Sequence, residues 1–144
     1  MADMSSADWE FWDTWMRAQR LLVRELDRGL QRDCGISKAE FSVLMTLTRP
    51  MRVGELADAL GWEKSRVAHL LTRMENRGLV ARIEDGATGR RTGVELTGEG
   101  RRAAESATRV HGATIRRLVL DRLAPEQAEA IQAWGEQLIG RLDD

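Results

Sequence analysis

The chain has 144 residues, of which 42% are hydrophobic and 31% charged, and its formal net charge at pH 7 is −1. This composition is typical of one globular domain, and the charge lacks the strongly basic balance of many nucleic-acid-binding domains. No apolar run reaches the roughly 20 residues of a membrane span, and no basic-then-apolar leader is present, so we expect a cytoplasmic protein without a membrane partner. The single cysteine, Cys34, cannot form an intramolecular disulfide, which agrees with a reducing compartment.

The first predicted element is a long helix over residues 8–33. Its apolar stripe is wide and aromatic, and it includes Trp12, Trp15, Ala18, Leu22 and Leu26. Exposed aromatic patches are uncommon on monomers, so we expect this helix to pack against a second copy of the chain. The alternative is that its tryptophans cover a core within one chain.

The second predicted helix has the best-defined start. Ser37 and Glu40 have the spacing of a capping box, with Ile36 and Phe41 as a hydrophobic staple around it. The side chains expected to point inward are Phe41, Leu44, Met45 and Leu47. The helix should stop at 48–50, and residues 51–53 should form a short strand.

Residues 54–78 predict two helices joined by a tight turn. Gly61 follows the first helix, where a C-cap favours a residue that tolerates positive φ. The second helix should bury an i, i+3, i+4, i+7 stripe made of Val67, Leu70, Leu71 and Met74. Its opposite face then carries Ser65, Arg66, His69, Thr72 and Arg73, and Gly78 ends it.

Two β-like runs follow, at 79–83 and 92–96, and the loop between them carries Arg90 and Arg91. The predicted fold is therefore mainly α with a small β wing, that is, a winged helix-turn-helix over residues 37–97. Residues 63–91 hold seven basic and four acidic side chains, so positive charge is concentrated in this part of the chain.

Thr97 should cap a second long helix that runs to about residue 123, and Pro125 should start the last one. The small winged core offers neither terminal helix a partner of matching length. We expect residues 8–33 and 98–142 to be dimerisation helices within a single domain over 1–144.

An exposed helix of this kind fits the major groove of double-stranded DNA. We expect Ser65, Arg66 and His69 to contact base edges, and Lys64, Thr72 and Arg73 to contact phosphates. Arg90 and Arg91 on the wing could reach phosphates or the minor groove. The alternative is an ordinary solvated helix face beside a flexible hairpin. Arg77 and Arg82 could equally pair with Glu75 or Glu84.

The segments GELADALG, KSRVAHLLTRMENRGLVAR and GRRTGVELTGEG resemble the core of the multiple-antibiotic-resistance regulator (MarR) family. The resemblance needs no insertion, and the flanking helices fit it too. One departure concerns the wing, where the family pattern has Asp-x-Arg and this chain has Thr88-Gly89-Arg90. Arg90 could be held by Thr88, by Asp85, or by neither.

The resemblance implies a homodimeric transcriptional regulator of a pseudo-palindromic operator, a repressor released by a small aromatic or lipophilic effector. A pocket for the effector could be lined by Trp12, Trp15, His111 and Trp134, although these side chains could equally be core or interface residues. Some similar proteins sense peroxides through a cysteine near the start of the first helix, whereas Cys34 lies at its end. The rival interpretation is a winged-helix protein-interaction module that does not bind DNA.

Nothing in the sequence indicates catalysis. It has no phosphate-cradling glycine loop and no nucleophile elbow. Two histidines and one cysteine give no metal-ligand spacing, so we expect no enzyme activity, no metal and no cofactor.

Overall fold

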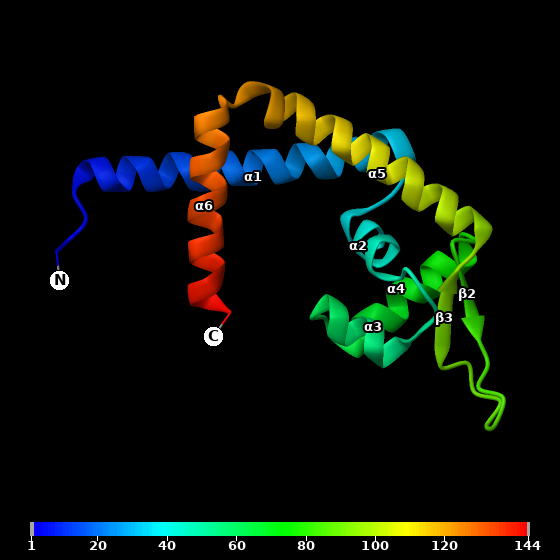
Figure 1. Cartoon of the computed structure of the whole chain (residues 1–144). Coiled ribbons are helices and arrows are strands. Elements are labelled where there is room, and N and C mark those ends of the chain that lie inside the picture. The colour runs from blue at the N-terminus through cyan, green and yellow to red at the C-terminus, as the bar shows by residue number, and fades with distance from the viewer. Residues whose placement is uncertain (1, 144) are drawn as a thin grey trace. The chain divides into compact units, whose positions relative to one another are not determined.

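The computed structural model describes residues 2–143, and the chain divides into two compact units, Met1–His111 and Gly112–Asp144. The fold is mainly helical with one small antiparallel sheet, as predicted (Figure 1). In chain order the elements are α1 (Ser6–Cys34), α2 (Lys38–Thr46), β1 (Met51–Arg52), α3 (Val53–Leu60), α4 (Lys64–Asn76), β2 (Val80–Ile83), β3 (Gly93–Leu96), α5 (Gly98–Leu118), a 3-10 turn (Leu120–Arg122) and α6 (Pro125–Leu142).

Helix α1 begins two residues before the predicted start, because Ser5 and Asp8 form a capping box. The Ser5 hydroxyl accepts a hydrogen bond from the Asp8 backbone N–H at 3.2 Å, and the Asp8 carboxylate accepts one from the Ser5 N–H at 2.8 Å. The Ser5 hydroxyl also donates to the Asp8 carboxylate at 2.7 Å. This side-chain hydrogen bond and, after it, the one from the Ser5 backbone N–H lower the pKa of Asp8. The helix ends as predicted at Gly35, which has φ 63°.

The capping box of α2 is confirmed. The Glu40 N–H donates to the Ser37 hydroxyl at 3.1 Å, and the Ser37 N–H donates to the Glu40 carboxylate at 3.1 Å. Met45 does not point into the core as predicted, since it is 37% exposed, and Val43 is fully buried instead. The buried face of α2 is Val43, Leu44 and Leu47, and the 100° turn per residue carries Met45 off that face.

The two helices of the helix-turn-helix share one apolar core. The four predicted core residues of α4, namely Val67, Leu70, Leu71 and Met74, are each at most 2% exposed. Leu56 and Ala57 of α3 pack in the same cluster. Gly61 ends α3 with φ 69°, as its position predicted, and the Trp62 N–H then bonds to the Ala57 carbonyl at 3.0 Å.

The wing is a three-stranded antiparallel sheet in the order β1-β3-β2. Met51 pairs with Val94 and Val80 pairs with Leu96, which confirms the short third strand. Val53 belongs to α3 rather than to this strand. Figure 1 shows the loop between β2 and β3 reaching beyond the strands.

The first turn of α5 is joined closely to β2. The Thr97 hydroxyl donates to the Gly78 carbonyl at 2.6 Å and accepts from the Gly100 N–H at 3.0 Å, while the Thr97 N–H donates to the Leu79 carbonyl at 3.1 Å. A Cβ atom at Gly100 would lie 2.0 Å from that Leu79 oxygen. Only glycine permits this approach of helix to strand.

The end of α5 differs from the prediction of one helix to about residue 123. The α-helix stops at Leu118, and Leu120–Arg122 tighten into a 3-10 turn, a common form at helix ends. Ala124 is extended (φ −67°, ψ 151°), as expected for a residue before proline, and Pro125 begins α6 as predicted. Among the described residues, no helix is both long enough and apolar enough to cross a membrane.

Candidate nucleic-acid interface

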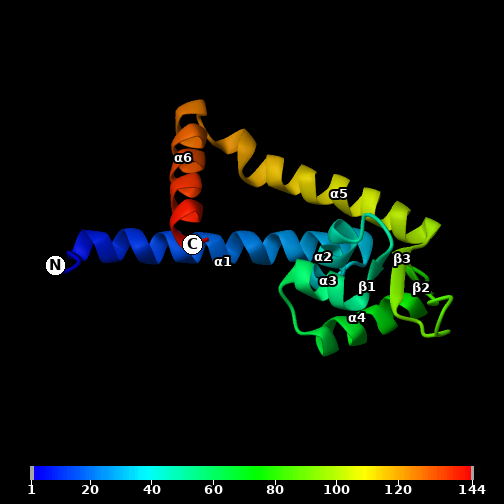
Figure 2. The ribbon, with the colours of Figure 1, turned by 60° about the horizontal axis from the view of Figure 1, so that its bottom comes forward.

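The candidate interface is the solvent-facing side of α4. The six residues predicted to contact DNA from this helix are all exposed: Lys64, Ser65, Arg66, His69, Thr72 and Arg73. The opposite side of the helix is the buried stripe described above, so the amphipathic pattern fixes which face meets solvent. The 13 residues of α4 make a rod roughly 20 Å long, and Figure 2 shows it along one edge of the helical cluster.

The first turn of α4 contains a contact that sequence reasoning missed. The guanidinium carbon of Arg66 lies over the Trp62 ring, 4.3 Å from its centroid. Trp62 is half-buried and packs against the core cluster, whereas Arg66 is exposed. Trp62 follows Gly61 in the turn between the two helices, and its i, i+4 spacing from Arg66 was a usable sequence signal.

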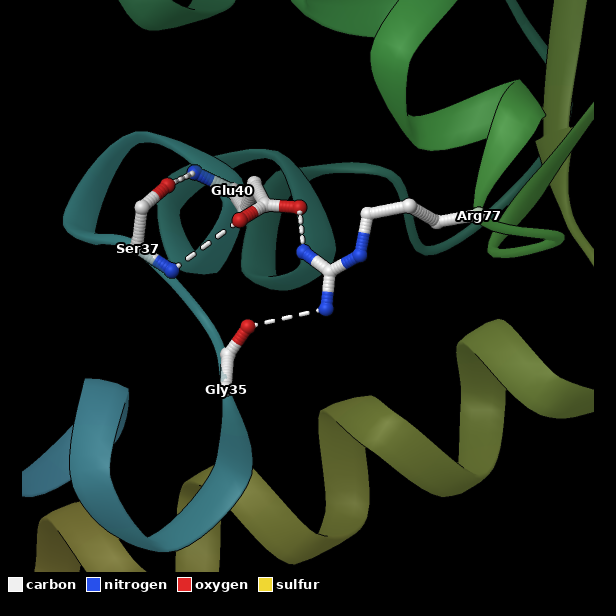
Figure 3. A network of polar contacts seen from close by, with 4 residues as sticks. All are labelled: Gly35, Ser37, Glu40 and Arg77. Carbon is white, nitrogen blue, oxygen red and sulfur yellow. Dashed lines mark hydrogen bonds and ion pairs between the residues drawn. The ribbon is translucent and has the colours of Figure 1, made fainter.

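The C-terminal end of α4 is held by Arg77. Its guanidinium donates to the Glu40 carboxylate through Nη1 and to the Gly35 carbonyl at 2.8 Å through Nη2 (Figure 3). The same Glu40 side chain accepts from the Ser37 N–H, and Glu40 is only 7% exposed. Pairing with Glu75 or Glu84 was one alternative for Arg77, but its carboxylate partner is Glu40 in α2. It therefore links α4 to the junction of α1 and α2.

Glu75 organises the base of the wing. Its carboxylate forms ion pairs with Arg91 and, at 3.9 Å, with Arg82, which confirms one of the two pairings expected for Arg82. Arg82 also donates to the Thr72 hydroxyl at 3.3 Å, and that hydroxyl donates to the Ala68 carbonyl. Arg91 and Thr72, both predicted to contact DNA, thus already have partners within the chain.

The tip of the wing is ordered through its backbone. The Asp85 carboxylate accepts from the Ala87 N–H at 2.8 Å, and the Thr88 hydroxyl accepts from the Arg90 N–H at 3.3 Å. Gly89 has φ 67°. Both proposed holders of Arg90 therefore act on the loop backbone, and between residues 2 and 143 its side chain makes no ion pair.

The four residues considered for an effector pocket lie on three helices. Trp12 and Trp15 are on α1, His111 is on α5 and Trp134 is on α6 of the second unit. The His111 ring packs against Phe41 with centroids 4.7 Å apart, and its Nδ1 is buried without a hydrogen-bond partner. Trp12 and Trp134 are about half exposed.

Neither a redox centre nor a metal centre is assembled in the described part of the chain. The Cys34 sulfur lies 3.9 Å from the Ser106 hydroxyl and is half-buried. Over residues 2–143, no group of His, Cys, Asp or Glu side chains could hold a metal ion.

Two short helices joined by a turn, with the second helix exposed and a β-hairpin directly after it, define the winged helix-turn-helix class of DNA-binding proteins. A family model described as the IclR helix-turn-helix domain matches residues 41–84, which run from α2 through β2. The transcriptional regulator HosA of Escherichia coli is 33% identical over 96 residues, which cover 65% of this chain and 70% of HosA.

Solved structures extend the likeness over the whole chain. AbsC, a MarR family transcriptional regulator from Streptomyces coelicolor, is 30% identical with a TM-score of 0.76, covering 97% of this chain and 99% of AbsC. Sco3205, a MarR family regulator from the same organism solved in complex with DNA, is 28% identical with a TM-score of 0.80, covering 99% of this chain and 92% of Sco3205. The chain belongs to the MarR family of transcriptional regulators, which are not enzymes.

Proposed function

We propose that the protein is a homodimeric, sequence-specific regulator that inserts α4 into the major groove of double-stranded DNA. The observation that carries this proposal is the exposed face of α4, with three cationic side chains, Lys64, Arg66 and Arg73, backed by a fully buried stripe. The DNA complex of the similar protein Sco3205 supports it.

The contacts divide by chemistry. Ser65, Arg66 and His69 would donate to or accept from base edges, while Lys64 and Arg73 would neutralise phosphates. Thr72 would contact a phosphate only through a hydroxyl that already accepts a hydrogen bond from Arg82. On the wing, Arg90 would insert toward a phosphate or the minor groove, and Arg91 would stay with Glu75 and stiffen the hairpin.

The dimer is proposed from apolar surface that one chain leaves exposed. Helix α1 buries only Gly29 and Leu30, and α6 buries no residue. The exposed large apolar side chains include Trp9, Phe11, Trp12, Leu21 and Val23 on α1, and Ile131, Trp134, Leu138, Ile139 and Leu142 on α6. So many exposed large apolar side chains on a single helix, seen here on each of the two, are uncommon on a monomer. Residues 8–33 and 98–142 would bury them against a second copy within one domain over 1–144.

Two-fold symmetry would present two α4 helices to successive major grooves about 34 Å apart, so the operator would be an approximate palindrome. A small aromatic or lipophilic effector near Trp12, Trp15 and His111 would release a repressor if it favoured another spacing of the two helices. The buried Nδ1 of His111, which has no hydrogen-bond partner, is a group such an effector could satisfy.

The test is fluorescence anisotropy with DNA from the gene's own upstream region and a scrambled duplex, at two salt concentrations. We expect tight binding to the native duplex alone, with affinity falling steeply as salt rises. Equal weak binding to both duplexes, followed by failure of a random-sequence selection, would contradict the proposal. It would favour the interaction module instead, which the net charge of −1 and the engaged Arg91 support.

Sedimentation tests the dimer directly. We expect a species of twice the 16.2 kDa chain mass at micromolar concentration. Leu138→Glu places a charge on the apolar stripe of α6 and should shift the protein toward monomer, whereas Ala133→Glu places the same charge on the opposite face of the helix and should not. A wild-type species of 16.2 kDa would rule the dimer out.

A further inference from the structure

We propose that Trp62 is a positioning residue for Arg66, and that the pair reads one guanine in each half of the operator. This inference rests on the proposed function, because it concerns the same face of α4. It adds a residue outside the recognition helix and a base preference at one fixed position.

The contact follows from helix geometry. Side chains of a helix lean toward its N-terminus, so Arg66 in the first turn of α4 extends back over the residue four positions earlier. That residue is Trp62, whose ring packs against the core cluster and whose backbone N–H donates to the Ala57 carbonyl. Packing on the core makes the ring a platform, and the guanidinium carbon lies 4.3 Å from its centroid, well inside cation–π range.

The contact leaves the hydrogen-bonding capacity of Arg66 unused. A guanidinium carries its five N–H donors at its edge, in a fork that matches two acceptors. Within residues 2–143, the structure gives the Arg66 side chain no hydrogen bond and no ion pair, whereas Arg77, Arg82 and Arg91 all have carboxylate partners. Arg66 is thus held by its face and is free at its edge.

The surroundings of Arg66 carry no excess positive charge. Trp62 and Arg66 line a surface hollow between α3 and the start of α4, and Asp58, Glu63 and Lys64 line the same hollow. Its two acidic and two basic residues balance, so this hollow has no net positive charge to select a phosphate over a neutral base edge. In the major groove, only guanine offers the two adjacent acceptors, O6 and N7, that the guanidinium fork fits.

Holding the side chain in advance lowers the ordering cost of binding, because a free arginine loses much rotamer freedom when it is fixed. Loss of the platform should therefore weaken the guanine contact and relax the preference at that position. It should leave phosphate contacts, and hence the salt dependence of binding, unchanged.

The experiment starts with a random-sequence selection on the full-length protein to obtain its binding site. Each guanine of that site is then replaced by 7-deazaguanine, which keeps base pairing but lacks the N7 acceptor. We expect the wild-type protein to lose roughly tenfold in affinity at one position per half-site, in line with a bidentate contact. Arg66→Ala, which removes all of the guanidinium donors, should show no loss at that position.

The decisive variants change the platform. Trp62→Leu should bind the unmodified site about two- to fivefold more weakly and discriminate less at that guanine, with the wild-type salt slope. Trp62→Phe keeps an aromatic face and should retain most of the discrimination, so it is the conservative control. If Trp62→Leu does not fold by circular dichroism, Trp62→Met, which also lacks an aromatic face, takes its place. Lys64→Ala is the matched control. It should lower the salt slope of DNA binding by about one and keep the base preference.

Two results would overturn the inference. If Trp62→Leu folds and discriminates like the wild-type protein, Trp62 does not position Arg66, although DNA binding stands. If Arg66→Ala keeps the full 7-deazaguanine loss, Arg66 does not read guanine. Failure of the wild-type protein to select any site would instead remove the proposed function, and this inference with it.

Discussion

The Arg77 bridge gives a quantitative prediction about stability. Replacing Arg77 with Ala removes the hydrogen bonds to Glu40 and to the Gly35 carbonyl, and it leaves a carboxylate in a site that is 7% exposed. Net contributions of charge-assisted hydrogen bonds are about 1.5–3 kcal/mol, and an unsatisfied buried acceptor costs a similar amount. The Arg77 side chain is 44% exposed, so water screens and partly replaces these contacts. We expect Arg77→Ala to lower the free energy of unfolding by about 2 kcal/mol.

Urea unfolding at a fixed protein concentration measures this loss. With an m value of about 2 kcal/mol/M for a chain of this size, the midpoint should fall by about 1 M without a change in m. Glu40→Gln is the informative partner, because its amide oxygen can still accept from the Ser37 N–H while the charge is gone. A double-mutant cycle of the two changes should give a coupling energy of about 1 kcal/mol or more.

A small effect would refute the reasoning. A shift of the Arg77→Ala midpoint below about 0.3 M, or strict additivity with Glu40→Gln, would mean that water replaces the bridge without loss.

Three further predictions concern other parts of the chain. Ser5→Ala should raise the pKa of Asp8 toward that of an ordinary aspartate, as read by a carboxyl NMR titration. Because the folded-state pKa of Asp8 is lowered, its contribution to the stability of α1 is fully present above the ordinary aspartate pKa and is lost as the pH falls through the lowered value. An Asp8 titration in the variant that matches the wild type would contradict this. Gly100→Ala should lower the free energy of unfolding by about 2–3 kcal/mol, since the new Cβ would lie 2.0 Å from the Leu79 backbone oxygen. A melting curve identical to that of the wild type would show that the helix can shift without cost. Arg90→Ala should reduce the salt slope of DNA binding by about one, whereas Arg91→Ala should change it less, and equal slopes would mean that the ion pair of Arg91 opens on DNA.

Features set within one or two turns were predictable from sequence. The capping box at Ser37, the left-handed Gly61 and the buried stripe of α4 each depend on residues a few positions apart, so their spacing specifies them. The early start of α1 has the same local origin, because Ser5 and Asp8 also have capping-box spacing, and that signal was overlooked.

Choices between distant partners were not predictable. Arg77 had two acidic residues nearby in sequence, yet it pairs with Glu40, 37 positions away, because packing brings α2 beside the end of α4. The exposure of Met45 likewise depends on which face of α2 the core takes. The DNA contacts stay predictions, since side-chain exposure on α4 defines a surface and not its ligand.

The joint between Gly100 and Leu79 has a mechanical consequence. Backbone meets backbone there without an intervening side chain, so no rotamer change can absorb a tilt of α5. Any displacement of the first turn of α5 must therefore carry the Leu79 backbone with it, and Leu79 leads directly into β2 of the wing.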